Sequence, residues 1–280
     1  MVSYARDVAS NGSAQLGLTQ SVERALGLLT CFTDAQPRLR VSDLARQLEL
    51  SQSTVSRLLA TMESLGFVER DPQTGLYGLG LELVTLAGVA LNQLDVRRQA
   101  VAELSAVAAD LGLAANLAIL RNDELFYLAT VEGPKAPKLF TMIGKRAPLH
   151  ATGMGKALLA HLPPDDQHAV LSRLHYPRFT RHTAGSPDEL RPMLEAAVRR
   201  GYATEREELA FGRACIAAVI RDASGSVVAA TSISGPLSAL NLDRREDQLA
   251  ARVIEMADTV SHRLGLVTVP PSFARDGRAY

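Results

Sequence analysis

The segment that most constrains the fold is SQSTVSRLLATMESL, residues 51–65, because its apolar residues recur with the period of one helical face. These apolar residues are Val55, Leu58, Leu59, Met62 and Leu65. The opposite face carries short polar side chains and one arginine, Arg57. A solvated helix usually mixes acids and bases at i, i+4 spacing. A face with short donors and almost no acid is instead typical of a helix that approaches another molecule closely.

The segments around this helix predict a small domain of three helices and a hairpin. Apolar spacing predicts a first helix over residues 21–32, with Ser21 as its N-cap, and a short second helix that begins at residues 42–43. Gly66 is placed to end the third helix. Two short strands, residues 67–70 and 76–79, flank a loop with Pro and Gly. This order predicts a winged helix-turn-helix, whose third helix places small polar residues in the major groove of DNA.

Composition limits the remaining function classes. A chain of 280 residues, 47% hydrophobic and 21% charged, is ordinary for a globular protein of two domains. Segment 1–17 is polar and lacks a signal-peptide core, and no apolar run is long enough for a bilayer, so we expect a cytoplasmic protein. Cys31 and Cys215 stand far apart, which disfavours a disulfide or zinc framework. Residues 1–80 hold seven arginines, no lysine and eight acids, so DNA binding requires positive charge gathered on one face.

The rest of the chain predicts a linker and a mixed second domain. Residues 80–111 keep a nearly continuous helical pattern. Strands are predicted at 115–120, 125–131, 138–143, 215–221 and 227–234, and helices at 155–162, 164–174, 187–200 and 244–264. Strand hairpins at both ends with helices between them indicate an α+β domain, an antiparallel sheet flanked by helices. The predicted domains are a flexible N-terminal tail at 1–17, a DNA-binding domain at 18–80, a linker helix at 81–98, an effector-binding domain at 99–266 and a C-terminal tail at 267–280.

Short motifs along the chain resemble, in order, those of the IclR family of bacterial transcriptional regulators. The N-terminal motifs are SVERAL at 21–26, LA at 44–45, STVSRLL at 53–59 and YGLG at 77–80. The C-terminal motifs are LHATGMGKALLA at 149–160, GYA at 201–203, EE at 207–208, Gly212, IAA at 216–218 and SISGP at 232–236. The resemblance extends from about residue 18 to residue 266, and it is the ordered set of motifs that makes it specific.

The resemblance implies a transcriptional regulator rather than an enzyme, without a cofactor or a metal. It implies a GAF-like second domain that senses a small organic or aromatic acid, and dimers or tetramers that bind palindromic promoter DNA. One position departs from the family pattern. The family commonly has Lys or Arg near the start of the recognition helix, where this chain has Gln52. Arg57 and Arg70 would then carry more of the affinity for DNA.

The predicted DNA contacts lie at the start of the third helix and on the wing. We expect Gln52, Ser53 and Ser56 to enter the major groove. Arg57 and Arg70 would hold phosphates or groove edges. The full predicted set is Arg24, Ser51, Gln52, Ser53, Thr54, Ser56, Arg57 and Arg70. Ser and Thr also favour N-caps, so a purely structural role for the residues that start this helix remains open.

The effector site is predicted mainly from the resemblance, which places Cys215, Ser232 and Ser234 on strands that line a pocket. The alternation of Ser232 and Ser234 agrees with this, because it puts both hydroxyls on one face. Backbone N–H groups at the start of a helix near Gly153 are expected to hold a carboxylate. The full predicted set is Leu139, Gly153, Met154, Glu205, Cys215, Ser232 and Ser234.

Glu205 is the awkward member of this set, because an ionised carboxylate repels an anionic ligand. The resemblance places it on a loop before the Cys215 strand. Three possibilities remain open: it is protonated, it is turned away, or it accepts a hydroxyl of the ligand. The last of these favours a small hydroxylated or keto acid, plausibly aromatic.

Three other motifs do not indicate a phosphate-binding, metal or catalytic site. GMGK at 153–156 is no P-loop, because His150 stands where the upstream Gly is required and no Ser or Thr follows Lys156. Four histidines at 161, 168, 175 and 182 are spaced by seven, but the intervening prolines break any single helix, so no metal site is expected. Glu207 and Glu208 are expected to be solvated or to anchor a loop rather than to act in catalysis.

Two alternatives to a DNA-binding regulator stay open, and one assembly is predicted. The chain could be an enzyme with a GAF-like fold that acts on small acids, or an adaptor whose winged helix binds protein. The linker carries an apolar stripe that is unusual for a lone exposed helix, and we expect it to pack across a dimer interface. The stripe consists of Leu83, Leu86, Val89 (or Ala90) and Leu94.

Overall fold

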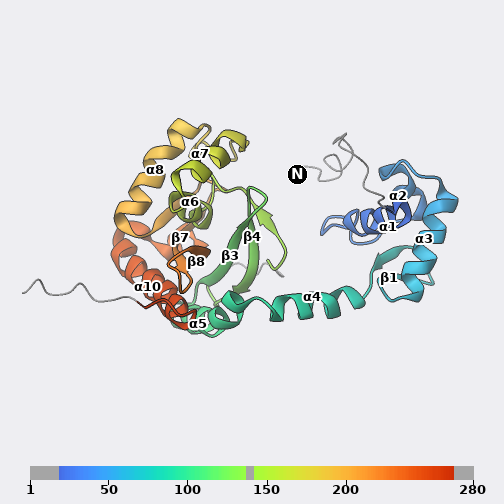
Figure 1. Cartoon of the computed structure of the whole chain (residues 1–280), viewed down its shortest axis with the longest axis horizontal. Helices are drawn as coiled ribbons and strands as arrows, with labels where there is room; N and C mark the ends of the chain where they lie inside the picture. Colours follow the sequence, from blue (N-terminus) through green and yellow to red (C-terminus); the bar gives the residue numbers. More distant parts are fainter. Residues whose placement is uncertain (1–18, 137–141, 268–280) are drawn as a thin grey trace, which may run out of the picture. The chain divides into compact units, whose positions relative to one another are not determined.

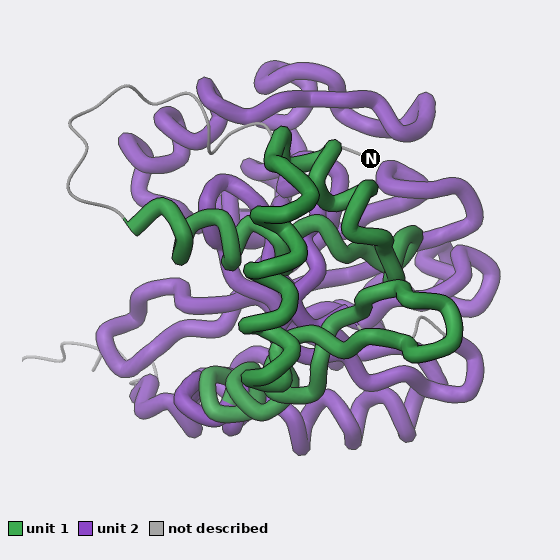
Figure 2. Tube along the Cα trace, turned by 90° about the vertical axis from the view of Figure 1, so that its right-hand side faces the viewer, with its two compact units in different colours: residues 1–91 green, residues 92–280 purple. Residues whose placement is uncertain are grey.

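Three helices and a two-stranded hairpin form in the first part of the chain, where amphipathic segments alternate with turn residues. The computed structural model describes residues 19–136 and 142–267. The chain divides into two units, Met1–Leu91 and Asn92–Tyr280, coloured separately in Figure 2. The first unit contains α1 (Gln20–Thr30), α2 (Val41–Gln47), α3 (Gln52–Ser64), β1 (Val68–Arg70) and β2 (Tyr77–Leu79) (Figure 1). Strands β1 and β2 pair antiparallel, so the predicted winged helix-turn-helix is confirmed.

The core of the first unit is built from the apolar faces that the sequence predicted. Leu28 of α1, Leu44 of α2, and Val55 and Leu59 of α3 are completely buried. Helix α3 ends before Gly66, whose positive φ of 76° lets the chain turn into β1. The three helices and the wing therefore hold α3 in a fixed orientation within this unit.

The ends of α1 differ from the prediction. The helix begins at Gln20 with Thr19 at the N-cap position, so Ser21 is not its cap. It also ends at Thr30, because the Cys31 N–H bonds to the carbonyl of Leu28 and tightens the last turn. Helix α2 begins at Val41, with Arg40 at the N-cap position.

The helix predicted over residues 80–111 is two helices, α4 (Glu82–Asn92) and α5 (Asp95–Leu111). Leu94 between them has an extended backbone, with φ −87° and ψ 97°, and it packs against the core of the second unit. Helix α4 has no buried residue, whereas α5 buries one face against the sheet of the second unit. The break therefore lies where the chain passes from an exposed helix to a packed one.

The second unit is built on a six-stranded antiparallel sheet with the strand order β5-β4-β3-β8-β7-β6. The strands are β3 (Ala114–Arg121), β4 (Glu124–Val131), β5 (Arg146–Ala147), β6 (Ala203–Arg206), β7 (Arg213–Arg221) and β8 (Val227–Pro236). Helices α5 and α10 (Leu242–Arg263) pack on one face of this sheet. The other face carries α6 (Gly153–Ala160), with α7 (Pro164–Arg173) and α8 (Pro187–Arg200) behind it (Figure 1). The predicted α+β fold with an antiparallel sheet is confirmed.

Three predictions in this unit need correction. A strand that was not predicted, β6, contains Glu205, so this residue does not lie on a loop. The predicted strand 138–143 lies mostly outside the described residues, and its last two residues, Met142 and Ile143, belong to no strand. The closing helix begins at Leu242 instead of residue 244, after a short helix α9 (Leu237–Leu240). No helix in residues 19–136 and 142–267 combines the length and the apolar character needed to cross a membrane.

Candidate DNA interface and effector cavity

The outer face of α3 is the polar surface that its sequence predicted. Gln52, Ser53, Ser56 and Arg57 are exposed, while the apolar residues Val55, Leu59 and Met62 are buried. Within the described residues, the side chains of Gln52, Ser56 and Arg57 make no hydrogen bond or ion pair. Their donors are therefore available to another molecule.

The first residues of α3 do act as a helix cap. The Ser51 hydroxyl accepts the backbone N–H of Thr54 at 3.2 Å. It also lies 2.8 Å from the Thr54 hydroxyl and 3.0 Å from the Ser53 hydroxyl. Capping thus accounts for Ser51 and Thr54, and it leaves Gln52, Ser56 and Arg57 without a structural explanation.

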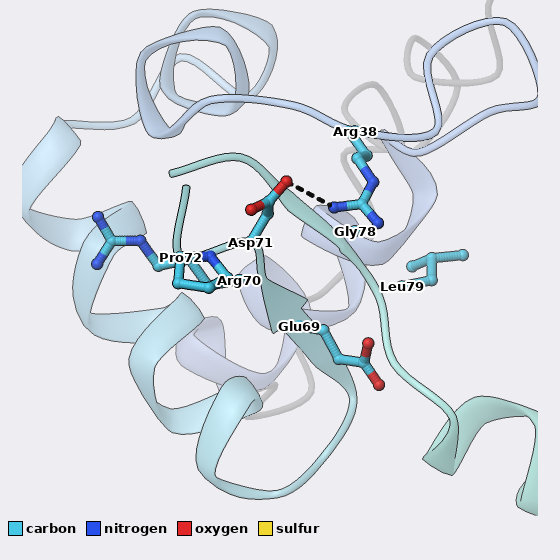
Figure 3. Close-up of a pocket in the computed structure, with 7 residues that line it drawn as sticks. All are labelled: Arg38, Glu69, Arg70, Asp71, Pro72, Gly78 and Leu79. Carbon is cyan, nitrogen blue, oxygen red and sulfur yellow. Dashed lines mark hydrogen bonds and ion pairs between the residues drawn. The ribbon is translucent and has the colours of Figure 1, made fainter. Parts of the chain in front are cut away.

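The wing adds a second group of charged residues (Figure 3). Arg70 ends β1, and its guanidinium lies 5.8 Å from the centre of the Tyr77 ring. Arg38 pairs with Asp71 at 3.4 Å, and in Figure 3 the Arg70 side chain points away from Arg38. A cavity of about 300 Å³ is lined by Arg38, Glu69, Arg70, Asp71, Pro72, Gly78 and Leu79.

Arg38 was not predicted as part of this surface, because it is remote in sequence from the wing. The structure brings it there through backbone pairing: Leu39 and Tyr77 exchange two N–H to carbonyl hydrogen bonds of 2.9 Å. Asp71 accepts the backbone N–H of Gln73, and this bond, with others, holds the pKa of Asp71 below its ordinary value. Arg24, the remaining predicted contact, lies half-buried on α1.

In the second unit, strand register brings the predicted effector residues onto one face of the sheet. Cys215 lies opposite Glu205 on one side and opposite Ser234 on the other. Ser232 lies opposite Asn116 of β3. Residues that oppose one another in antiparallel strands point to the same face, so these five side chains share the face that α6 covers. The shared face of Ser232 and Ser234 agrees with their alternation in sequence.

The start of α6 is closed against this face. A Cβ added to Gly153 would lie 2.7 Å from the Cys215 sulfur, so only glycine permits this approach. Burial raises the pKa of the Cys215 thiol to about 12. The N–H of Gly155 donates a hydrogen bond of 3.1 Å to the hydroxyl oxygen of Thr152. Gly153 and Met154 are buried at the start of α6, and the carboxylate predicted there remains a prediction.

Glu205 is buried, and its carboxylate is directed toward the loop that follows β6. Its Oε1 accepts the backbone N–H of Glu208 at 2.8 Å and of Leu209 at 3.3 Å. Burial raises the pKa of this carboxyl above its ordinary value. The Oε1 atom thus holds the backbone of the loop that follows β6, and the role of Glu205 toward a ligand remains a prediction.

Glu208 anchors the same loop through a buried ion pair. Its two carboxylate oxygens lie 2.5 and 2.6 Å from Nζ of Lys156 on α6. The carbonyl of Glu208 also accepts the hydroxyl of Thr183 at 2.5 Å. The prediction that this acidic pair anchors a loop is confirmed for Glu208. Lys156 forms an ion pair with Glu208, which agrees with the prediction that GMGK is not a phosphate-binding loop.

A cavity of about 220 Å³ opens beside this polar face. It is lined by Ala114, Asn116, Thr130, Glu132, Met142, Phe211, Gly212, Arg213, Ser234, Gly235 and Pro236. Of the predicted effector residues only Ser234 lines it, and Leu139 lies outside the described residues. Asn116 and Arg213 were missed. The available signal was a lone amide within the apolar run of β3 and an arginine two residues before Cys215.

Asn116 organises the polar side of the cavity. Its Nδ2 donates to Ser234 at 2.9 Å and to Ser232 at 3.1 Å, and its Oδ1 accepts the Thr130 hydroxyl at 3.0 Å. The amide is therefore fully engaged in holding the two serines. Among residues 19–136 and 142–267 no cluster of three or more His, Cys, Asp or Glu side chains could hold a metal ion.

Two family models match this chain. The IclR helix-turn-helix domain matches residues 21–72, and the bacterial transcriptional regulator IclR C-terminal domain matches residues 88–262. The HTH-type transcriptional regulator XynR of Escherichia coli K12 is 34% identical over 217 residues, which is 78% of this chain and 86% of that protein. The HTH-type transcriptional repressor AllR of Klebsiella pneumoniae is 35% identical over 254 residues, 91% of this chain and 93% of AllR.

Solved structures show the same fold. The IclR protein of Thermotoga maritima has a TM-score of 0.74 and 26% identity, covering 88% of this chain and 98% of its own. An IclR homologue from Microbacterium hydrocarbonoxydans, crystallised with 4-hydroxybenzoate, has a TM-score of 0.76 and 28% identity, covering 87% of this chain and 98% of its own.

Proposed function

Because this chain belongs to the IclR family of bacterial transcriptional regulators, we propose that it binds palindromic promoter DNA as a dimer and that a small organic acid controls this binding. It is a DNA-binding transcriptional regulator, and its curated relatives are regulators rather than enzymes. The enzyme and the protein adaptor that the sequence left open are therefore set aside. Residues 18–80 act as the DNA-binding domain and residues 99–266 as the effector domain.

The observation that carries the DNA proposal is the outer face of α3, where Gln52, Ser56 and Arg57 are exposed and their side chains have no partner among the described residues. Gln52, Ser53 and Ser56 read base edges in the major groove, and Ser51 and Thr54 fix the start of the helix beside the phosphates. Arg57 and the wing residue Arg70 supply positive charge, with Arg24 at the margin of the surface.

Replacing Arg57 by alanine is expected to weaken binding to promoter DNA about tenfold or more, because a guanidinium contact to DNA is worth about 1–3 kcal/mol. The fold should persist, since Arg57 is exposed and its side chain has no partner in the described part of the chain. Gel-shift titration of the full-length variant measures the effect. Arg98→Ala is the matched control, because this exposed arginine lies on α5 and, among the described residues, pairs only with Asp95. Equal affinity of the Arg57 variant and the wild type would refute α3 as the recognition helix.

The proposed dimer rests on α4, which exposes an apolar surface in the single chain. Val84, Leu86 and Val89 are 66%, 49% and 59% exposed, and Leu81 just before the helix is 73% exposed. Leu83 is half-buried, and Leu94 leaves the predicted stripe because it packs in the second unit. An exposed apolar helix of this kind is stabilised when it packs on a second copy.

Light scattering of the full-length protein at micromolar concentration is expected to give the mass of a dimer or a tetramer. Leu86→Glu combined with Val89→Glu should shift the mass toward the monomer, because charges buried in an apolar interface lose their hydration. Asn92→Glu, an exposed change at the end of the same helix, serves as the control. A monomeric wild type would exclude the proposed dimer.

The effector proposal is supported by the 220 Å³ cavity of the second unit, which combines apolar walls with polar side chains. The Microbacterium homologue was crystallised with 4-hydroxybenzoate. We therefore place small hydroxylated or aromatic acids first among the compounds to test, with Ser234 at the cavity wall. Ser232, Cys215, Met154, Gly153 and Glu205 form the buried layer behind it, and Leu139 completes the predicted set.

A further inference from the structure

Arg213 and Glu132 are the charged residues that line the cavity, and Arg213 has no ion-pair partner in the described part of the chain. It begins β7, half-buried, and faces the same side of the sheet as Cys215 two residues later. Arg213 lies opposite Pro236, and Cys215 lies opposite Ser234. Arg213 and Ser234 are thus diagonal neighbours on one face, close enough for both to reach one bound molecule.

The groups around Arg213 do not form an ion pair with its guanidinium in the described part of the chain. Its guanidinium lies near the buried Tyr127 hydroxyl of β4, where its positive charge partly opposes the rise in the pKa of Tyr127 that burial causes. Within residues 19–136 and 142–267, no carboxylate oxygen lies at ion-pair distance from this guanidinium. Glu205 is near enough to interact electrostatically, but its Oε1 is directed to the backbone of Glu208 and Leu209. A half-buried cation of this kind is unfavourable unless an anion joins it.

Ser234 supplies a second donor to the same space. Its oxygen accepts a hydrogen from the Asn116 amide at 2.9 Å, and Asn116 in turn accepts the Thr130 hydroxyl. Because Ser234 already accepts, its own hydroxyl hydrogen is left to donate. Ser234 and Arg213 both line the cavity, so two donors on adjacent strands converge on it.

We propose that Arg213 is the anion-binding residue of the cavity. The ligand is a small carboxylic acid whose carboxylate binds the Arg213 guanidinium and the Ser234 hydroxyl, while its apolar part lies against Met142, Phe211 and Pro236. This inference rests on the proposed function, because it names the residue that binds the carboxylate of the proposed acid. It places the anion at the start of β7, beside Arg213. The arginine makes the cavity select an acid over its neutral amide, since charge-assisted bonds are about twice as strong as neutral ones.

Isothermal titration calorimetry with the full-length protein tests this proposal. The probes are benzoate, 4-hydroxyphenylacetate, lactate, pyruvate and glutarate at millimolar concentrations, each beside its neutral amide. At least one acid is expected to bind the wild type, with its amide at least about tenfold weaker. Arg213→Gln should weaken that acid at least about tenfold and remove the preference over the amide, and Arg213→Lys should restore part of both. Arg191→Gln, an equal charge change on the exposed face of α8, should bind as the wild type does.

The possible results distinguish a wrong assignment of Arg213 from a wrong proposed effector. If an acid binds Arg213→Gln as tightly as the wild type, Arg213 is not the anion-binding residue, even though the protein senses acids. If no acid in the series binds the wild type, the acid class is wrong, and with it the proposed effector. Specific DNA binding by the wild type, measured in the same preparation, reports on the regulator function independently of either result.

Discussion

Replacing Lys156 by methionine is expected to lower the free energy of unfolding by about 3–5 kcal/mol, because it leaves the Glu208 carboxylate buried without its cation. The side chains of Lys156 and Glu208 are only 3% and 8% exposed, and Nζ lies 2.5 and 2.6 Å from the two carboxylate oxygens. Urea denaturation followed by circular dichroism measures the loss. A loss of this size is a large part of the stability of an ordinary domain.

The double variant Lys156→Met, Glu208→Leu is the matched control for this prediction. Replacing a buried ion pair by apolar side chains of similar volume is often neutral or stabilising, so the double variant should recover most of the lost stability. If the two single losses simply add in the double variant, the pair does not act as a unit, and the anchoring of the 207–212 loop to α6 must have another cause.

Replacing Ser234 by leucine is expected to abolish the response to the effector and to leave the affinity for DNA nearly unchanged. Ser234 is buried and lines the 220 Å³ cavity, so the larger side chain fills space that the ligand needs and removes a hydroxyl donor. Loss of one hydrogen bond to a charged group alone weakens binding about 10- to 100-fold. Calorimetry with an acid that binds the wild type measures the loss, and gel shift measures the DNA affinity.

Ser238→Leu provides the control for this variant, because Ser238 is exposed on α9 and does not line the cavity. It should bind the acid and the DNA as the wild type does. Unchanged acid affinity in the Ser234 variant would mean that the effector binds elsewhere in the protein.

The architecture of the first unit could be predicted from the sequence because it depends on signals between residues close together in the chain. The apolar period of α3, the cap at Ser51 and the glycine at 66 each act within a few residues. The errors there are confined to helix ends, where a tightened turn at Cys31 decides the last residue. The break at Leu94 was missed because the helical pattern continues through it, and only its packing on the second unit separates α4 from α5.

The effector cavity could be predicted only in part, because it depends on contacts far apart in sequence. The alternation of Ser232 and Ser234 is local and was recognised. The hydrogen bonds from Asn116 to these serines span more than a hundred residues, so no local pattern could reveal them. Gly153 looked like an anion site because it starts a helix. The close packing of Gly153 on Cys215, which also requires a glycine, could not be predicted because it joins residues far apart in sequence.

Fluorescence anisotropy of the full-length protein on a promoter duplex tests the central claim most directly. The titration compares a duplex that carries two inverted half-sites with a scrambled duplex, at several salt concentrations, with and without a bound acid. The account predicts tighter binding to the inverted half-sites, an affinity that falls steeply on a log–log plot against salt, and a shift of that affinity when the acid is added. Equal affinity for the two duplexes, with no response to any acid that calorimetry shows to bind, would contradict it.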